Sequence, residues 1–130
     1  MRYATSMPKR ANAELWIKLS LPGVGQVGPG KIELLRQINE HQSIAAAARA
    51  MNMSYRRAWL LIDEMNKLFE EPVVAKWQGG KSQGGASLTE FGQKLLENYA
   101  VLVERSNEIN RELLDEIGRS ASRAESFKRA

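Results

Sequence analysis

The residues with the most distinctive chemistry lie in one short stretch at the start of a predicted helix. They are Ser54, Tyr55, Arg56 and Arg57. Arginine donates paired hydrogen bonds to phosphate oxygens and guanine edges, and hydroxyl groups add single hydrogen bonds. The helix dipole disfavours cations at a helix N-terminus, so helix stability does not explain the two arginines. A polyanion that docks at this end of the helix does, and the stretch therefore predicts contact with nucleic acid.

Two helices joined by a short turn are predicted around this stretch, between residues 43 and 70. The first contains the run Ala45–Ala48, and alanine is both the best helix former and slim enough for close packing. Asn52 tolerates the left-handed conformation that ends many helices, and Ser54 is a good N-cap for the second helix. In a helix-turn-helix, the first turn of the second helix contacts base edges in the major groove. Arg49, near the end of the first helix, is then expected to contact the DNA backbone.

Apolar side chains at helical spacing predict how these helices pack. The second helix has a stripe with steps of three and four residues. It consists of Ala58, Leu61, Ile62, Met65, Leu68 and Phe69. A further helix is expected over Lys31–His41, with Ile32, Leu34, Leu35 and Ile38 facing inward. The three helices form one unit, and the alternative to DNA reading is a helical hairpin with a solvated charged edge.

Two glycine-rich segments match phosphate-binding loops only in part. Gly23–Gly28 has the spacing of a dinucleotide-binding loop, but Pro29 precedes the helix and no acidic residue closes a second strand about 20 residues later. We expect a flexible connector here, after a strand over Glu14–Ser20. The run Gly80–Ser82 resembles the end of a P-loop but has Ala75 where the first glycine is required.

The segment after the second helix of the motif is typical of a β-hairpin. Pro72 cannot continue a helix, and strands are expected over Val73–Gln78 and Ala86–Leu88. The glycine-rich loop between them places Lys81, Ser82 and Gln83 at its tip. Glycines let a backbone approach phosphates closely, and a lysine can neutralise one. A hairpin in this position is the wing of a winged helix-turn-helix.

A long C-terminal helix is expected after the wing, capped either by Thr89 or by a box of Ser87 with Glu90. At about 29 residues it would be roughly 43 Å long, against a diameter of about 36 Å for a domain of this size. The helix should therefore project and need a partner. Its predicted dimerisation residues are Leu95, Leu102, Ile109 and Leu113. Seven-residue spacing favours helix–helix association, which predicts a homodimer, and the alternative is a helix folded back on its own domain.

Composition is compatible with nucleic-acid binding and argues against several other classes. The chain has 130 residues, a formal net charge of +4, no cysteine and one histidine, His41. Cysteine-containing zinc sites, disulfides and cysteine nucleophiles are excluded, and we expect no metal site and no enzyme. No secretory signal or membrane-spanning run is present, so a cytoplasmic protein is expected. Trp16, Trp59 and Trp77 are expected in core or hinge packing.

The expected organisation has four parts. Residues 1–13 form a disordered basic N-terminus, and residues 14–88 form the winged helix-turn-helix domain. Residues 89–118 form the long dimerisation helix, and residues 119–130 form a disordered tail. The fold class is mainly α (α+β), with an N-terminal strand, a β-hairpin wing and a long C-terminal dimerisation helix.

Four short motifs coincide with the predicted helix-turn-helix and wing. They are Ser43-Ile-Ala-Ala-Ala-Ala-Arg49, Met53-Ser-Tyr-Arg-Arg-Ala-Trp59, Asp63-Glu-Met-Asn66 and Gly79-Gly-Lys-Ser-Gln-Gly-Gly-Ala86, the last followed by Leu88-Thr89. Together they resemble the N-terminal DNA-binding domain of ModE-type molybdate-responsive regulators, a winged helix related to that of LysR-type regulators. The resemblance implies a dimer held by the first and last helices. It also implies major-groove reading from Ser54, Tyr55, Arg56 and Arg57, with Lys81 and Gln83 on the adjacent backbone or minor groove.

The resemblance also bears on ligands. Full-length members of that family carry a C-terminal oxyanion-binding module that senses molybdate or tungstate. We expect that module to be absent here, so no cofactor is expected in this chain, and a separate sensor protein is a possible partner. The predicted function is sequence-specific binding to double-stranded DNA for transcription control. The alternatives are a protein-interaction module on a winged-helix scaffold and an architectural DNA binder without sequence preference.

Overall fold

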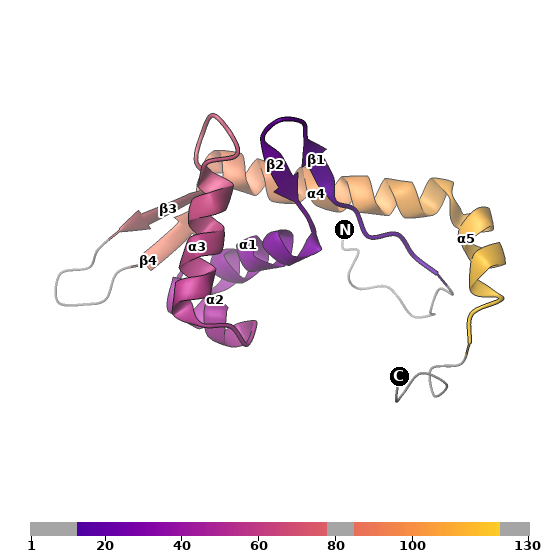
Figure 1. Ribbon diagram of the computed structural model, residues 1–130, viewed down its shortest axis with the longest axis horizontal. Coiled ribbons are helices and arrows are strands. Elements are labelled where there is room, and N and C mark those ends of the chain that lie inside the picture. Colours follow the sequence, from indigo (N-terminus) through magenta and orange to yellow (C-terminus); the bar gives the residue numbers. More distant parts are fainter. Residues whose placement is uncertain (1–12, 78–84, 123–130) are drawn as a thin grey trace. The chain divides into compact units, whose positions relative to one another are not determined.

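The computed structural model describes residues 13–77 and 85–122, which fall into two compact units (Figure 1). One unit is Ile17–Tyr99. The other contains the chain through Trp16 and the chain from Ala100 onward. The boundary between the two units falls inside a single helix.

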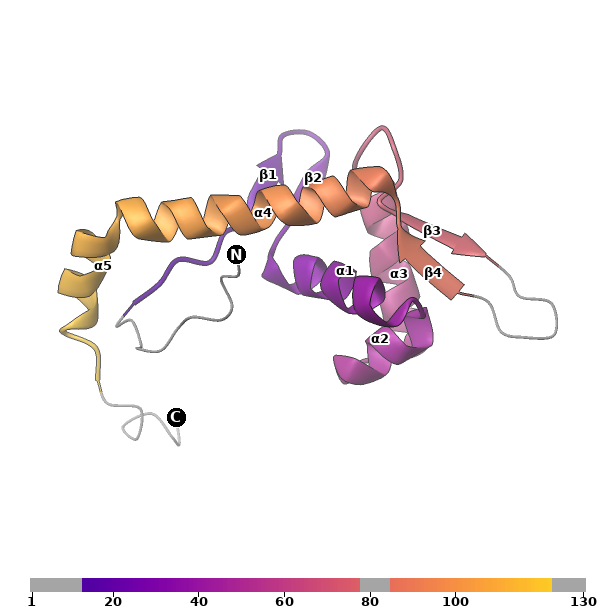
Figure 2. The same cartoon turned by 180° about the vertical axis from the view of Figure 1, so that it is seen from behind.

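The first unit is a winged helix-turn-helix. Its three-helix body consists of α1 (Pro29–His41), α2 (Ile44–Ala50) and α3 (Tyr55–Asn66) (Figure 2). Before it, β1 (Leu19–Leu21) pairs with β2 (Gly25–Val27), and after it, β3 (Val74–Trp77) pairs with β4 (Gly85–Leu88). Both pairs are antiparallel, with Leu19 opposite Val27 and Val74 opposite Leu88. The chain continues into α4 (Glu90–Ile109) and α5 (Arg111–Gly118).

Side-chain caps delimit the helices of the motif as the sequence predicts. The Ser43 hydroxyl oxygen accepts a hydrogen bond from the Ala46 amide at 3.0 Å, at the start of α2. Asn52 in the turn has a left-handed φ of 56°, which ends α2. The Ser54 hydroxyl oxygen then accepts from the Arg57 amide at 3.0 Å and caps α3. At α4 the cap is Thr89, whose hydroxyl oxygen accepts from the Gly92 amide at 2.9 Å.

One face of each helix supplies the hydrophobic core. The four residues of α1 that were expected to face inward, Ile32, Leu34, Leu35 and Ile38, are all buried. Ala47 and Ala48 of α2 are buried as well, so small side chains bring α2 close to its neighbours. On α3 the stripe is buried at Ala58, Ile62 and Met65 and half-buried at Leu61.

The expectation of a flexible connector after the first strand is wrong, because residues 19–27 form a hairpin. Pro22 and Gly23 occupy the centre of a tight turn in which the Val24 amide donates to the Leu21 carbonyl at 2.8 Å. Gly23 has a φ of +78°, the conformation that a type II turn requires at its third residue and that glycine adopts without strain. The Pro-Gly pair was the sequence signal for this turn.

The predicted strand over Glu14–Ser20 is also wrong in extent. In the second unit, residues 13–16 are not in a strand, because a side chain of α4 forms hydrogen bonds with the backbone of this segment. The Asn107 side-chain oxygen accepts from the Leu15 amide at 2.6 Å, and its NH2 group donates to the Leu15 carbonyl at 3.3 Å. An amide side chain thus replaces the strand partner that the alternating sequence pattern suggested.

The helix that was expected to run unbroken to Gly118 is interrupted. α4 ends at Ile109 and α5 begins at Arg111, with Asn110 between them at φ −106° and ψ 17°. The Asn110 side-chain NH2 group donates to the Ser106 carbonyl at 2.9 Å and so competes with the backbone for a helical acceptor. In the part of the chain that the structure describes, no helix is long and apolar enough to cross a membrane.

Two glycines in helices, one in a tightly packed place and one in an open place, allow the packing of the helices to be tested. A side-chain carbon at Gly92 in α4 would overlap the Val73 carbonyl oxygen, whereas one at Gly30 in α1 would meet no atom within 4 Å. We expect Gly92→Ala to destabilise the protein by about 1–3 kcal/mol through steric overlap. Gly30→Ala should stabilise it by roughly 0.4–1 kcal/mol by restricting the unfolded chain. Chemical denaturation of the two variants measures both effects, and shifts of the same sign would contradict the packing described here.

Candidate nucleic-acid interface

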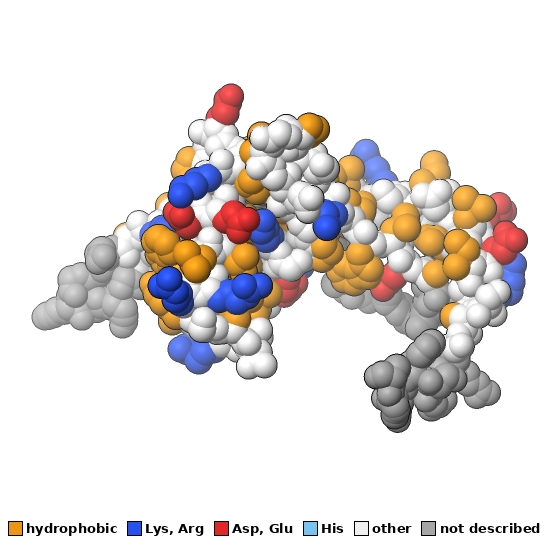
Figure 3. All heavy atoms as spheres, in the orientation of Figure 1, with side chains coloured by type: hydrophobic (Ala, Val, Ile, Leu, Met, Phe, Trp, Pro, Cys, Tyr) orange, Lys and Arg blue, Asp and Glu red, His pale blue; other side chains and the backbone are white. Residues whose placement is uncertain are grey.

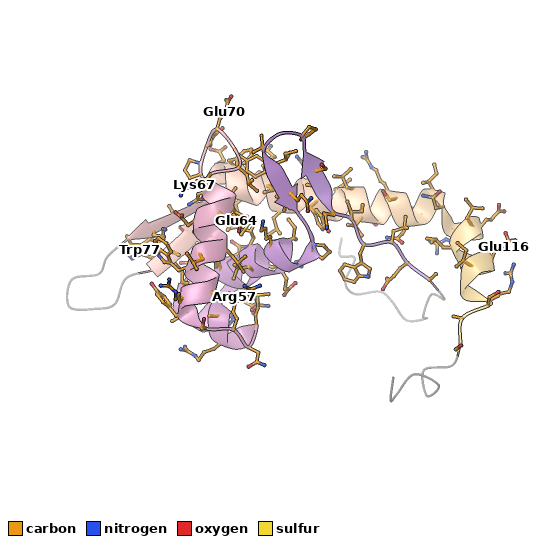
Figure 4. The ribbon with its side chains drawn as sticks, in the orientation of Figure 1. Arg57, Glu64, Lys67, Glu70, Trp77 and Glu116 are labelled. Atoms are coloured by element: carbon orange, nitrogen blue, oxygen red, sulfur yellow. The ribbon has the colours of Figure 1, made fainter. Side chains whose placement is uncertain are left out.

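The predicted base-reading residues lie on the exposed N-terminal turn of α3. Ser54, Tyr55, Arg56 and Arg57 are all exposed. Arg49 is exposed in the last turn of α2, just before the turn that leads into α3. Figure 4 shows Arg57 at the end of α3 that adjoins α2, with Glu64 and Lys67 toward the opposite end. The structure therefore gathers the five predicted residues at the helix-turn-helix, where a major groove would meet them.

The charges of α3 are divided along its length. Asp63 pairs with Lys67 at 3.1 Å, and Glu64 pairs with Lys31 of α1 at 3.4 Å. Among residues 13–77 and 85–122, no carboxylate forms an ion pair with Arg56 or Arg57. The acidic groups of the helix are thus partly neutralised by lysines. The guanidinium groups at its N-terminus remain available for an external anion.

A further cation on the first wing strand was missed at the level of sequence. The ammonium group of Lys76 lies 4.4 Å from the centroid of the Trp59 ring, a cation–π contact between β3 and α3. The contact holds a positive charge beside the helix that carries the arginines. The tryptophans were expected in core or hinge packing, and a core position is wrong for all three, because Trp16, Trp59 and Trp77 are 69%, 36% and 48% exposed. In the sequence, Trp59 lies beside the apolar stripe of α3 and not within it. This offset was the signal that its side chain does not point into the core.

Hydrogen bonds fix the start of the wing to α3. The Asn66 side-chain oxygen accepts from the amides of Val73 and Val74 at 2.8 and 3.1 Å, and its NH2 group donates to the Val74 carbonyl at 3.1 Å. The Thr89 hydroxyl donates to the Pro72 carbonyl at 2.8 Å. These bonds anchor β3 at the C-terminal end of α3. The predicted tip residues Lys81, Ser82 and Gln83 lie outside the described residues.

The residues predicted to dimerise differ in exposure. Leu95 is half-buried, whereas Leu102, Ile109 and Leu113 are exposed. The first three lie on α4 at seven-residue spacing, and Leu113 lies on α5. Apolar groups that remain exposed at this spacing are typical of a helix that associates with another helix.

No candidate metal centre accompanies these surfaces in the described part of the chain. There, no group of three or more histidine, aspartate or glutamate side chains is placed to hold a metal ion. Figure 3 shows basic, acidic and hydrophobic side chains together over α3.

Comparison with known proteins identifies relatives of this region. Residues 30–93 match the family described as bacterial regulatory helix-turn-helix protein, lysR family. The molybdenum-pterin-binding protein MopA of Rhodobacter capsulatus is 40% identical over 86 residues, which are 66% of this chain and 32% of MopA. The DNA-binding transcriptional dual regulator ModE of Escherichia coli K12 is 39% identical over 92 residues, 71% of this chain and 35% of ModE. The chain thus spans about a third of the length of these relatives.

Among solved structures, a LysR family transcriptional regulator aligns with a TM-score of 0.48 and 18% identity, over 64% of this chain and 27% of that one. The family match is the more informative finding, because residues 30–93 include nearly all of α1, all of α2 and α3, both wing strands and the start of α4. Residues 30–93 of this winged helix-turn-helix thus match the LysR family of bacterial regulatory helix-turn-helix proteins, and over about two thirds of its length the chain is a homologue of MopA and ModE.

Proposed function

We propose that this chain binds double-stranded DNA sequence-specifically and regulates transcription. The observation that carries the proposal is the pair of exposed arginines, Arg56 and Arg57, on the first turn of α3, without ion-pair partners among the described residues. The helix dipole opposes cations at this position, so their placement is explained by an anionic ligand. The names of relatives such as ModE describe transcriptional regulators, which supports the same function.

In the proposed complex, the first turn of α3 enters the major groove. Arg56 and Arg57 contact guanine edges or phosphates, and Ser54 and Tyr55 add hydrogen bonds. Arg49 contacts the DNA backbone from the end of α2. The wing residues Lys81, Ser82 and Gln83 contact the adjacent backbone or minor groove, and Lys76 adds a cation at the base of the wing.

We further propose that the chain is a homodimer that acts in the cytoplasm. Leu95, Leu102, Ile109 and Leu113 supply the apolar contacts between copies. Two-fold symmetry then requires a pseudo-palindromic DNA site with half-sites about 34–36 Å apart, or a multiple of that spacing. The proposal assigns no catalytic residue, metal or cofactor to this chain, and a separate sensor protein would supply the regulatory signal.

Replacement of either arginine tests the proposed base contacts. Arg56→Ala and Arg57→Ala should each weaken binding to a selected site by about five- to 150-fold, because a good bidentate base contact contributes about 1–3 kcal/mol of discrimination. Melting temperatures should be nearly unchanged, since both side chains are exposed. Lys18→Ala is the control, because it removes one exposed positive charge outside α3. Unchanged affinity in both arginine variants would refute the assignment.

Salt dependence separates base contacts from phosphate contacts. The logarithm of the association constant should fall linearly with the logarithm of salt concentration, with a slope of about −0.9 per neutralised phosphate. A variant that loses a phosphate contact flattens the slope by about one and weakens all sequences alike, whereas loss of a base contact relaxes sequence preference. Fluorescence anisotropy at several salt concentrations measures both. Affinity that is insensitive to salt would contradict the proposed mode of binding.

The proposed dimer is tested by mass in solution. Light scattering at micromolar concentration should give twice the chain mass of 14.6 kDa. Leu102→Glu should shift the mass to that of a single chain, because a charge would have to be buried at the proposed seam. Glu104→Gln, at an exposed position two residues further along α4, is the control and should leave the mass unchanged. A single-chain mass for the unmodified protein would rule out the dimer.

A further inference from the structure

An apolar side chain on the recognition helix lies outside the hydrophobic core. Leu60 is 47% exposed, whereas Ala58 and Ile62 on either side of it in sequence are fully buried. At 100° per residue, Leu60 projects from roughly the opposite side of α3 to the buried stripe. Core packing therefore does not account for a leucine at this position.

The same side of α3 carries a basic residue before Leu60 and another after it, and the acidic residues between them, Asp63 and Glu64, each form an ion pair with a lysine. Arg56 precedes it by four residues and Lys67 follows it by seven, and both spacings place side chains on one side of a helix. Figure 3 shows hydrophobic side chains over α3 with basic and acidic side chains beside them. If α3 lies in the major groove with Arg56 against a base, Leu60 must face the groove floor or wall one helical turn further along.

A leucine in the major groove can distinguish only one feature of the bases. It has no hydrogen-bonding group, so the donors and acceptors of guanine, cytosine and adenine give it no favourable partner. Thymine alone presents an apolar group there, the C5-methyl group. Four residues of helix span about 6 Å, which is close to the stacking height of two base pairs at 3.4 Å each.

We propose that Leu60 is a specificity-determining residue that recognises the methyl group of a thymine, within about two base pairs of the base that Arg56 contacts. The inference rests on the proposed function, because it requires α3 to lie in the major groove. It assigns a different kind of contact from those of Arg56 and Arg57. Those residues recognise hydrogen-bonding groups and charge, whereas Leu60 recognises apolar surface.

The test uses DNA in which thymine is replaced by uracil, since uracil lacks only the C5-methyl group. Genomic fragments are first selected on the unmodified protein, and each thymine of the selected site is then replaced singly by deoxyuridine. One position in each half-site should weaken binding by about fourfold, the effect of removing one buried methyl group. Leu60→Ala should bind the thymine site more weakly than the unmodified protein and should lose the preference for thymine over uracil at that position.

The control variant is Val24→Ala, which truncates another exposed aliphatic side chain, in the β1–β2 turn. It should keep the full preference for thymine. If a site is selected but Leu60→Ala responds to every deoxyuridine substitution as the unmodified protein does, the inference is overturned and the proposed function stands. If no sequence is selected at all, the proposed function fails, and the inference fails with it.

Discussion

The structure depends on the burial of one face of α3. Ala58, Ile62 and Met65 have no exposed surface, and they fix the rotation of the helix about its own axis. That rotation determines which side chains solvent and ligands can reach. Arg56 and Leu60 are exposed because residues two positions away in sequence are committed to the core. The apolar stripe thus determines the chemistry of the opposite face as well as contributing to stability.

The wing depends on α3 through polar rather than apolar contacts. The Asn66 side chain satisfies two amides and one carbonyl of residues 73 and 74, so the first wing strand begins at a fixed place relative to α3. The Thr89 hydroxyl and the absence of a side chain at Gly92 let α4 approach the same segment. Lys76 then lies over Trp59. A few side-chain hydrogen bonds and one glycine therefore place a cation of the wing beside the helix that carries the arginines.

Charge pairing on α3 separates its surface into two regions. Glu64 forms an ion pair with Lys31 of α1, and Asp63 forms one with Lys67, four residues further along the chain. Such surface pairs contribute little to stability. Their consequence is electrostatic, because they reduce the negative charge that would oppose an anionic ligand near the arginines. Exposed arginines, a lysine on the wing and an exposed leucine remain, and this combination suits a surface that offers both phosphates and base edges.

The helix-turn-helix and the buried face of α3 could be predicted from the sequence alone, because both depend on local signals. The caps at Ser43 and Ser54, the left-handed Asn52 and the buried stripe of α3 can all be recognised from residue type and spacing. The Pro22-Gly23 turn is also a local feature that residue type indicates, although the glycine spacing suggested a flexible connector there. Only the tertiary structure showed that the Asn107 side chain forms hydrogen bonds with the Leu15 backbone, where a neighbouring strand was expected. It also showed that Asn110 interrupts the last helix. It alone placed Lys76 over Trp59, since contacts between elements distant in sequence follow from packing and not from local propensity.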